Sequence, residues 1–142
     1  MPRFWRSMKR DADGLPTVDH AERKGLGVVG PESPRPDVQV DQDGNVALDG
    51  KGMSVCRDWR RLHPMLIPIR LKDRQPDALG SNDLHCFRFG DGAFEEGPVS
   101  EGLRLANARR GHANIVPDAK MTLESFRMRV EATRSGWQVD ET

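Results

Sequence analysis

The sequence lacks several features that would assign it to a functional class at once. Among its 142 residues, Lys plus Arg and Asp plus Glu both number 22, so the net charge is zero. Overall charge therefore gives no reason to expect a nucleic acid or a membrane as partner. The opening residues MPRFWRSMKR lack the apolar run of a secretory signal, and no later segment approaches the roughly 20 apolar residues of a membrane span. We therefore expect a cytoplasmic protein.

Cysteine is also scarce. Cys56 and Cys86 are the only two, which is too few for a disulfide framework, and we expect both thiols to be reduced. Together with His63 and His85 they supply ligand types that zinc uses. Their spacing matches no common zinc pattern, so no metal site is expected.

The composition that is present favours one small domain covering residues 1–142. A hydrophobic fraction of 36% and ten prolines predict a modest core with long connections. The longest connection is the Pro- and Gly-rich stretch 9–36, which we interpret as an extended loop with at most one helical turn near residues 18–24. A loop of this length is usually functional or partly mobile.

Alternating apolar residues predict strands, and one segment has the pattern of a helix. Residues 122–136 read as a helix capped by Thr122, with Leu123, Phe126 and Val130 on one face and Gly136 after its end. Pro68 reduces residues 65–71 to an edge strand or an extended loop. The expected extended segments are 3–8, a hairpin over 37–48 that turns at Asp43-Gly44, 54–56, 84–90 and 112–117. The sum is an α+β domain with a small, mainly antiparallel mixed sheet and few helices.

The stretch GKGMSVCRD, residues 50–58, is a candidate site. Gly50 and Gly52 precede Ser54, and glycine lets a backbone turn sharply or approach a ligand closely. A plain turn hydrogen bond from Ser54 is the alternative. We expect the glycines to bring the backbone near a ligand that Ser54 contacts.

Three stretches occur in the order RFWRSMKRDADGLP, GKGMSV and GHANIVPDAKMTLESF, the last leading into a helix that ends near a Trp. In this order they resemble the type VI secretion effector toxins with an ADP-ribosyltransferase-like fold. The resemblance implies an ADP-ribosyltransferase-like fold, NAD as cofactor, an immunity protein as partner and action in the cytosol of a target cell. Two positions depart from the family pattern: Met53 stands where Thr is frequent, and Asp118 follows Pro117 where Ala is frequent.

Carried onto this chain, the resemblance makes Ser54 and His112 the candidate catalytic residues. It makes Arg6, Gly52 and Ser54 the candidate NAD-binding residues. The planar guanidinium of Arg6 suits a phosphate or a ribose hydroxyl, and the imidazole of His112 suits ligand orientation or proton transfer. Transfer chemistry also favours a carboxylate near the ribose, but no glutamate has the expected spacing. The glutamates considered are Glu95, Glu96 and Glu124.

Two other functions remain open. An RNA-directed toxin would use His112 with Arg109 and Arg110 for acid-base chemistry and charge. A non-catalytic binding module would present the loop 9–36 to an unknown macromolecular partner. Arg6, Ser54 and His112 are also ordinary surface and turn residues when each is taken alone, so their meeting in one cleft is the decisive expectation.

Overall fold

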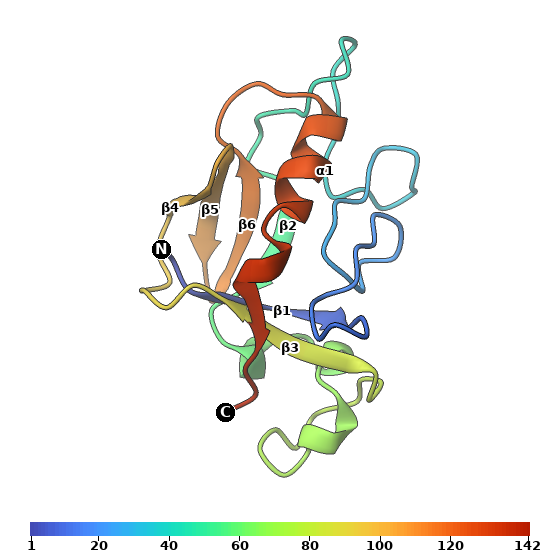
Figure 1. The fold of residues 1–142 in the computed structure, drawn as a ribbon, viewed down its shortest axis with the longest axis vertical. Coiled ribbons are helices and arrows are strands. Elements are labelled where there is room, and N and C mark those ends of the chain that lie inside the picture. The colour runs from blue at the N-terminus through green and yellow to red at the C-terminus, as the bar shows by residue number, and fades with distance from the viewer.

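The computed structural model describes residues 1–142 as one α+β domain with a curled, seven-stranded antiparallel sheet and a single α-helix (Figure 1). Every pairing between the named strands is antiparallel, so the expected mixture with parallel strands is absent. The strands in chain order are β1 (Phe4–Lys9), β2 (Met53–Cys56), β3 (Leu84–Phe89), β4 (Gly97–Ser100), β5 (Leu103–Arg109), β6 (His112–Pro117) and β7 (Trp137–Val139).

The two central strands of the sheet barely pair. The strand order is β4-β5-β6-β2-β1-β3-β7, yet β1 and β2 share only the register pair Trp5↔Cys56. The sheet therefore bends into a half made of β2, β6, β5 and β4 and a half made of β1, β3 and β7, which run in different directions in Figure 1. On either side of this single pair, which we call the crossing, β1 and β2 diverge.

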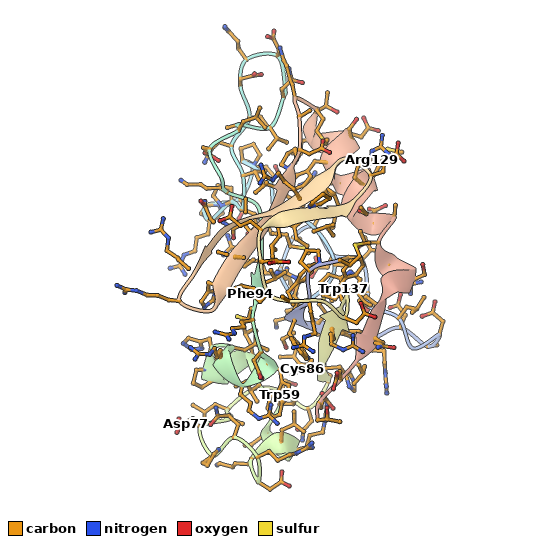
Figure 2. The ribbon with its side chains drawn as sticks, turned by 90° about the vertical axis from the view of Figure 1, so that its left-hand side faces the viewer. Trp59, Asp77, Cys86, Phe94, Arg129 and Trp137 are labelled. Carbon is orange, nitrogen blue, oxygen red and sulfur yellow. The ribbon has the colours of Figure 1, made fainter.

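The main hydrophobic core lies between the sheet and the helix α1 (Leu123–Glu131). The Thr122 side chain accepts a hydrogen bond from the Ser125 backbone N–H, as expected of an N-cap. Phe126 and Val130 are fully buried against strand residues, and Trp137, labelled in Figure 2, folds back onto the same core. The helix ends earlier than expected, and a short 3-10 turn (Arg134–Gly136) leads into β7.

A second, smaller hydrophobic core is formed largely by the segment that connects β2 to β3 in the sequence. Trp59 and Cys86, both labelled in Figure 2, belong to it and are buried together with Trp5 and Cys56 of the crossing. Three 3-10 turns cover it: Trp59–Arg61, Pro64–Leu66 and Ile69–Leu71. The expectation of an edge strand or extended loop over residues 65–71 is therefore wrong. Pro68 instead separates two tight turns, since its fixed φ of −60° suits the residue that precedes a turn.

After Lys9, the last residue of β1, the loop 9–36 has no regular helix or strand, and residues 18–24, where at most one helical turn was expected, form none. It is not a free surface loop. Leu26 and Val28 are fully buried in the main core. The Arg134 side chain donates to Pro16 O and to the carboxylates of Asp11 and Asp13, which fastens the loop to the end of the helix region.

Other expectations were met only in part. The hairpin over 37–48 is reduced to one bridge, Val40↔Val46, around the turn at Gly44. The strands β4, β5 and β7 were not expected. The hairpin joining β5 to β6 turns at Arg110 and Gly111, which both have positive φ, as a type I′ turn requires.

Candidate functional site

Arg6, Ser54 and His112 line one hollow of about 310 Å³, in the wedge where β1 and β2 diverge beyond the crossing. The three residues come from β1, β2 and β6, and the curled sheet brings them together from distant parts of the sequence. The expected convergence of the three residues on one hollow is therefore observed. The hollow is completed by Ser7, Glu22, Arg23, Lys24, Val55, Cys56, Leu62, His63 and Leu66.

Arg6 is the buried element of this hollow, with only 7% of its surface exposed. Its Nη1 donates to Ser54 O at 2.7 Å and its Nε donates to Gly25 O at 3.1 Å, so the side chain spans the wedge from β1 to β2 and the loop. Burial lowers the pKa of the guanidinium to about 10, which leaves it charged at neutral pH.

The third nitrogen of Arg6, Nη2, is buried and has no hydrogen-bond partner. In the whole chain only one other buried side-chain polar atom, Trp59 Nε1, lacks a partner. Native proteins pair nearly all such groups with protein atoms or ordered water, so this charged donor has hydrogen-bonding capacity left for a further acceptor.

Ser54 and His112 present exposed side chains to the same hollow. Ser54 faces Asn114 across the β2–β6 pairing, and His112 faces Cys56. The imidazole nitrogens of His112 lie 3.8 and 3.9 Å from Cys56 Sγ. The Ser54 hydroxyl makes no side-chain hydrogen bond within the protein, so the plain turn bond considered for it is absent.

The glycines ahead of Ser54 have a packing role that the sequence did not reveal. A Cβ on Gly52 would lie 2.0 Å from Ile115 O, so a side chain would collide with β6. Gly50 has φ of +82° and its carbonyl accepts hydrogen bonds from Asn107 and Asn114. The glycines let β2 approach β6, and this positions Ser54 at the edge of the wedge.

A neighbouring hollow of about 270 Å³ shares Arg6, Arg23 and Ser54 with the first one. Asp37 lines it and pairs with Arg23 Nε at 2.9 Å, while its second carboxylate oxygen accepts from the Val29 N–H. The remaining lining residues are Pro36, Lys51, Gly52 and Asn114. Gly52 therefore lies beside the second hollow and not the first.

The loop contributes residues that sequence reasoning did not select. Glu22, Arg23 and Lys24 of the loop line the first hollow, and Asp37, which directly follows the loop, lines the second, so carboxylates and cations lie beside Arg6. They follow one another closely in a polar stretch with no motif of its own. Only the return of this stretch to β1 and β2 makes them part of a site.

Cys56 and His63 were considered only as zinc ligands, yet both line the hollow. Burial raises the pKa of the Cys56 thiol to about 11, so it stays protonated and is a poor nucleophile at neutral pH. His63 Nδ1 accepts from the Met65 N–H at 3.2 Å, which leaves Nε2 free to donate. No group of three or more His, Cys, Asp and Glu side chains in the chain is arranged to hold a metal ion.

Arg109 and Arg110, which the RNA-directed alternative joined to His112, do not line this hollow. They are exposed at the β5–β6 turn, two residues and one residue before Gly111.

None of the helices is long and apolar enough to cross a bilayer. Comparisons of the chain with models of protein families, with curated proteins and with solved structures found no match.

Proposed function

We propose that the chain is a toxin of the ADP-ribosyltransferase type, which binds NAD in the paired hollows between β1 and β2. The observation that carries the proposal is the convergence of Arg6, Ser54 and His112 on one hollow of about 310 Å³. The sequence resemblance singled out these same three residues. Their meeting supports a ligand site, because buried charge and free polar groups around a concave surface are typical of one.

The residues present fit a dinucleotide. The two hollows, of about 310 and 270 Å³, adjoin at Arg6, Arg23 and Ser54, so an elongated ligand with anionic groups at its middle would meet the cations there. The unpaired Arg6 Nη2 supplies a donor for a phosphate oxygen. Arg23 and Lys24 would add charge from the loop.

When bound, NAD would supply ADP-ribose: the bond from ribose to nicotinamide breaks, nicotinamide keeps the bonding electrons, and a lone pair of the acceptor forms the new bond. The chain's own residues hold and shield this ligand. The free hydroxyl of Ser54 can bond a ribose hydroxyl, and the exposed imidazole of His112 can take the proton that the acceptor loses. Glu22 and Asp37 are the carboxylates that line the hollows.

The remaining parts of the proposal follow from the family resemblance. They are an immunity protein that neutralises the toxin and action in the cytosol of a target cell. Exposed Ser54 and His112 would be within reach of an inhibitor that covers the wedge. The acceptor of ADP-ribose is a macromolecule whose nature the hollow does not define.

The test is the release of nicotinamide from NAD by the purified protein, followed by chromatography, with NAD binding measured by calorimetry. Loss of a general acid-base group lowers a rate by about 10²- to 10⁴-fold, so His112→Ala should have an effect of that order. Ser54→Ala should weaken turnover while the protein stays folded. Ser135→Ala, which removes an exposed hydroxyl from the turn before β7, is the matched control and should behave as the parent chain.

Failure of the parent chain both to bind NAD and to release nicotinamide would contradict the proposal. So would full turnover by both Ser54→Ala and His112→Ala. Expression inside a bacterium gives an independent measurement: growth should arrest, and the same two variants should relieve the arrest.

A second candidate function is cleavage of RNA, which one observation favours. His63 and His112 both line the first hollow with Lys24, and two imidazoles beside a cation can act as acid and base on a phosphodiester. This function predicts degraded RNA in arrested cells. It also predicts loss of activity on His63→Ala and insensitivity to Ser54→Ala.

A further inference from the structure

A third hollow, of about 590 Å³, lies at the opposite end of the crossing. On this side of the pair Trp5↔Cys56, the lining includes Arg3, which directly precedes β1, Trp5 of the pair itself, and Arg57 and Asp58, which directly follow β2. We call this the arginine hollow. Its lining is completed by Arg61, Ala93 and Phe94.

The arginine hollow is strongly positive although the whole chain is neutral. Arg3, Arg57 and Arg61 are exposed, and none of them forms an ion pair. The salt bridges of the chain engage nine other Lys and Arg side chains and His20. Asp58 is the single acidic residue in the lining. Its carboxylate accepts from the Arg60 N–H at 3.0 Å and pairs with the Arg60 guanidinium at 3.3 Å.

Two more unpaired arginines adjoin this hollow. The Arg57 N–H donates to Gly111 O at 2.8 Å, and a Cβ on Gly111 would lie 2.9 Å from Arg61 Cδ. The β5–β6 turn, which carries exposed Arg109 and Arg110, therefore packs directly against the rim. Five arginines without a carboxylate partner therefore belong to the lining or to the turn that contacts it: three line the hollow and two lie on the turn.

The arginine hollow also has aromatic and planar surfaces. The Arg3 guanidinium lies 5.7 Å from the centroid of the Trp5 ring, and Phe94 is half-buried on the other wall. Phe94, labelled in Figure 2, packs against the edge of the main core. Bases of single-stranded nucleic acids stack on aromatic rings and on arginine planes, while arginine forks hold phosphates.

We propose that the arginine hollow binds a nucleotide, with its phosphates on Arg57, Arg61 and the β5–β6 turn and its base against Arg3 and Phe94. The nucleotide can be free or part of a single strand, and both present the same chemistry. An acidic protein is disfavoured, because a stable protein interface needs about 800 Å² per partner and this surface is concave and narrow. The inference uses none of Arg6, Ser54 and His112 and stands apart from the proposed function.

The test is fluorescence anisotropy of a labelled single-stranded RNA of about ten nucleotides, titrated with the full chain at several salt concentrations. Binding should weaken with salt. The double variant Arg57→Gln/Arg61→Gln should lose affinity at least about tenfold and lower the salt slope by about 1.4, at about 0.7 for each phosphate contact on a single strand. Phe94→Ala should weaken binding about fivefold or more through lost stacking.

The matched control is Lys72→Gln/Arg104→Gln, which removes two exposed, unpaired charges elsewhere on the chain. It should keep the parent affinity, and equal loss in both double variants would overturn the proposal as unspecific attraction. Absence of binding by the parent chain of both the labelled RNA and a fluorescent ATP analogue at about 50 mM salt would also overturn it. Competition by ATP at similar concentrations would identify a free nucleotide as the ligand, and its failure beside RNA binding would identify a strand.

A further measurement distinguishes the arginine hollow from the first hollow. Arg57→Gln/Arg61→Gln should release nicotinamide from NAD at the parent rate, since neither residue lines the first hollow. Binding of poly-glutamate as tightly as RNA would assign the surface to an acidic partner and contradict the nucleotide proposal.

Discussion

The two ends of the crossing between β1 and β2 carry positive hollows of opposite character. On one side Arg6 is 7% exposed, hydrogen-bonded to backbone carbonyls and covered by the loop 9–36. On the other side Arg3, Arg57 and Arg61 are exposed and make no ion pairs. A buried, fixed charge defines where one ligand group must lie, whereas exposed arginines attract anions with little geometric demand.

The difference arises from what covers each wedge. The loop 9–36 returns to the first wedge and supplies Gly25 O as an acceptor for Arg6, together with Arg23 and Lys24. Only Ala93 and Phe94 reach the second wedge from another segment. The same pair of strands therefore produces one site built around a buried arginine and one lined by exposed arginines.

The largest effect that this comparison predicts is on stability. Arg6→Ala leaves Ser54 O and Gly25 O without their donor and detaches the loop from β1, and hydrogen bonds to charged groups are worth about 1.5–3 kcal/mol each. We expect the free energy of unfolding to fall by about 2–4 kcal/mol. Arg3→Ala, the matched change at the residue just before the same strand, should cost no more than about 1 kcal/mol.

Urea denaturation followed by tryptophan fluorescence measures both values. Equal costs for Arg6→Ala and Arg3→Ala would remove the distinction between a buried and an exposed charge. A lower cost for Arg6→Ala than for Arg3→Ala would mean that the burial of the guanidinium outweighs its two hydrogen bonds.

Much of the fold could be predicted from local patterns. The strands β1, β3 and β6 and the cap of α1 follow from alternation and from Thr122, which are properties of a few adjacent residues. The strand β5 reads LRLANAR, where alanines replace the larger apolar residues that mark a strand. Its pairing with β6 is set by the turn at Arg110-Gly111. Arg110 adopts a positive φ there, which the identity of the residue does not predict.

A second prediction concerns the loop 9–36, which supplies Gly25 O to Arg6 and lines the first hollow. Arg134→Gln removes the bonds to Asp11 and Asp13, so the loop should loosen from the helix region. Amide hydrogen exchange of Asp11, Thr17 and Leu26 should become faster, and NAD binding should weaken. RNA binding at the arginine hollow should not change.

Arg129→Gln is the control for this prediction, because it breaks an ion pair with Glu101 that lies away from the loop. Unaltered exchange in Arg134→Gln would show that buried Leu26 and Val28 hold the loop without help from the ion pairs. Equal weakening at both hollows would contradict their independence.

Only part of the candidate site could be predicted from the sequence. Arg6, Ser54 and His112 were found through the resemblance, and their meeting required the β1–β2 divergence, which no local pattern encodes. Arg23, whose φ is 60°, and Asp37 carry no motif, and their ion pair exists only because the loop closes on itself. The arginine hollow was not predicted either. The net charge of zero sums over the whole chain and does not reveal that several arginines lie together on one part of the surface.

The last prediction concerns the crossing that both hollows share. Burial raises the pKa of the Cys56 thiol to about 11 and that of Cys86 to about 12, from an ordinary value of 9.0. Between pH 9 and pH 11 the unfolded chain therefore loses thiol protons that the folded chain keeps, so stability falls as pH rises. Arg6, whose folded pKa of about 10 lies below its ordinary value, works in the opposite direction above pH 10.

The midpoint of urea unfolding, measured at steps from pH 8 to pH 11, should decrease in the parent chain and decrease less steeply in Cys56→Ala. Because Cys56 pairs with Trp5 at the crossing, the loss of structure should abolish NAD binding and RNA binding at the same pH. Loss of one before the other would mean that the two wedges open separately. The crossing would then be a hinge between independent sites, and not the common support from which both are built.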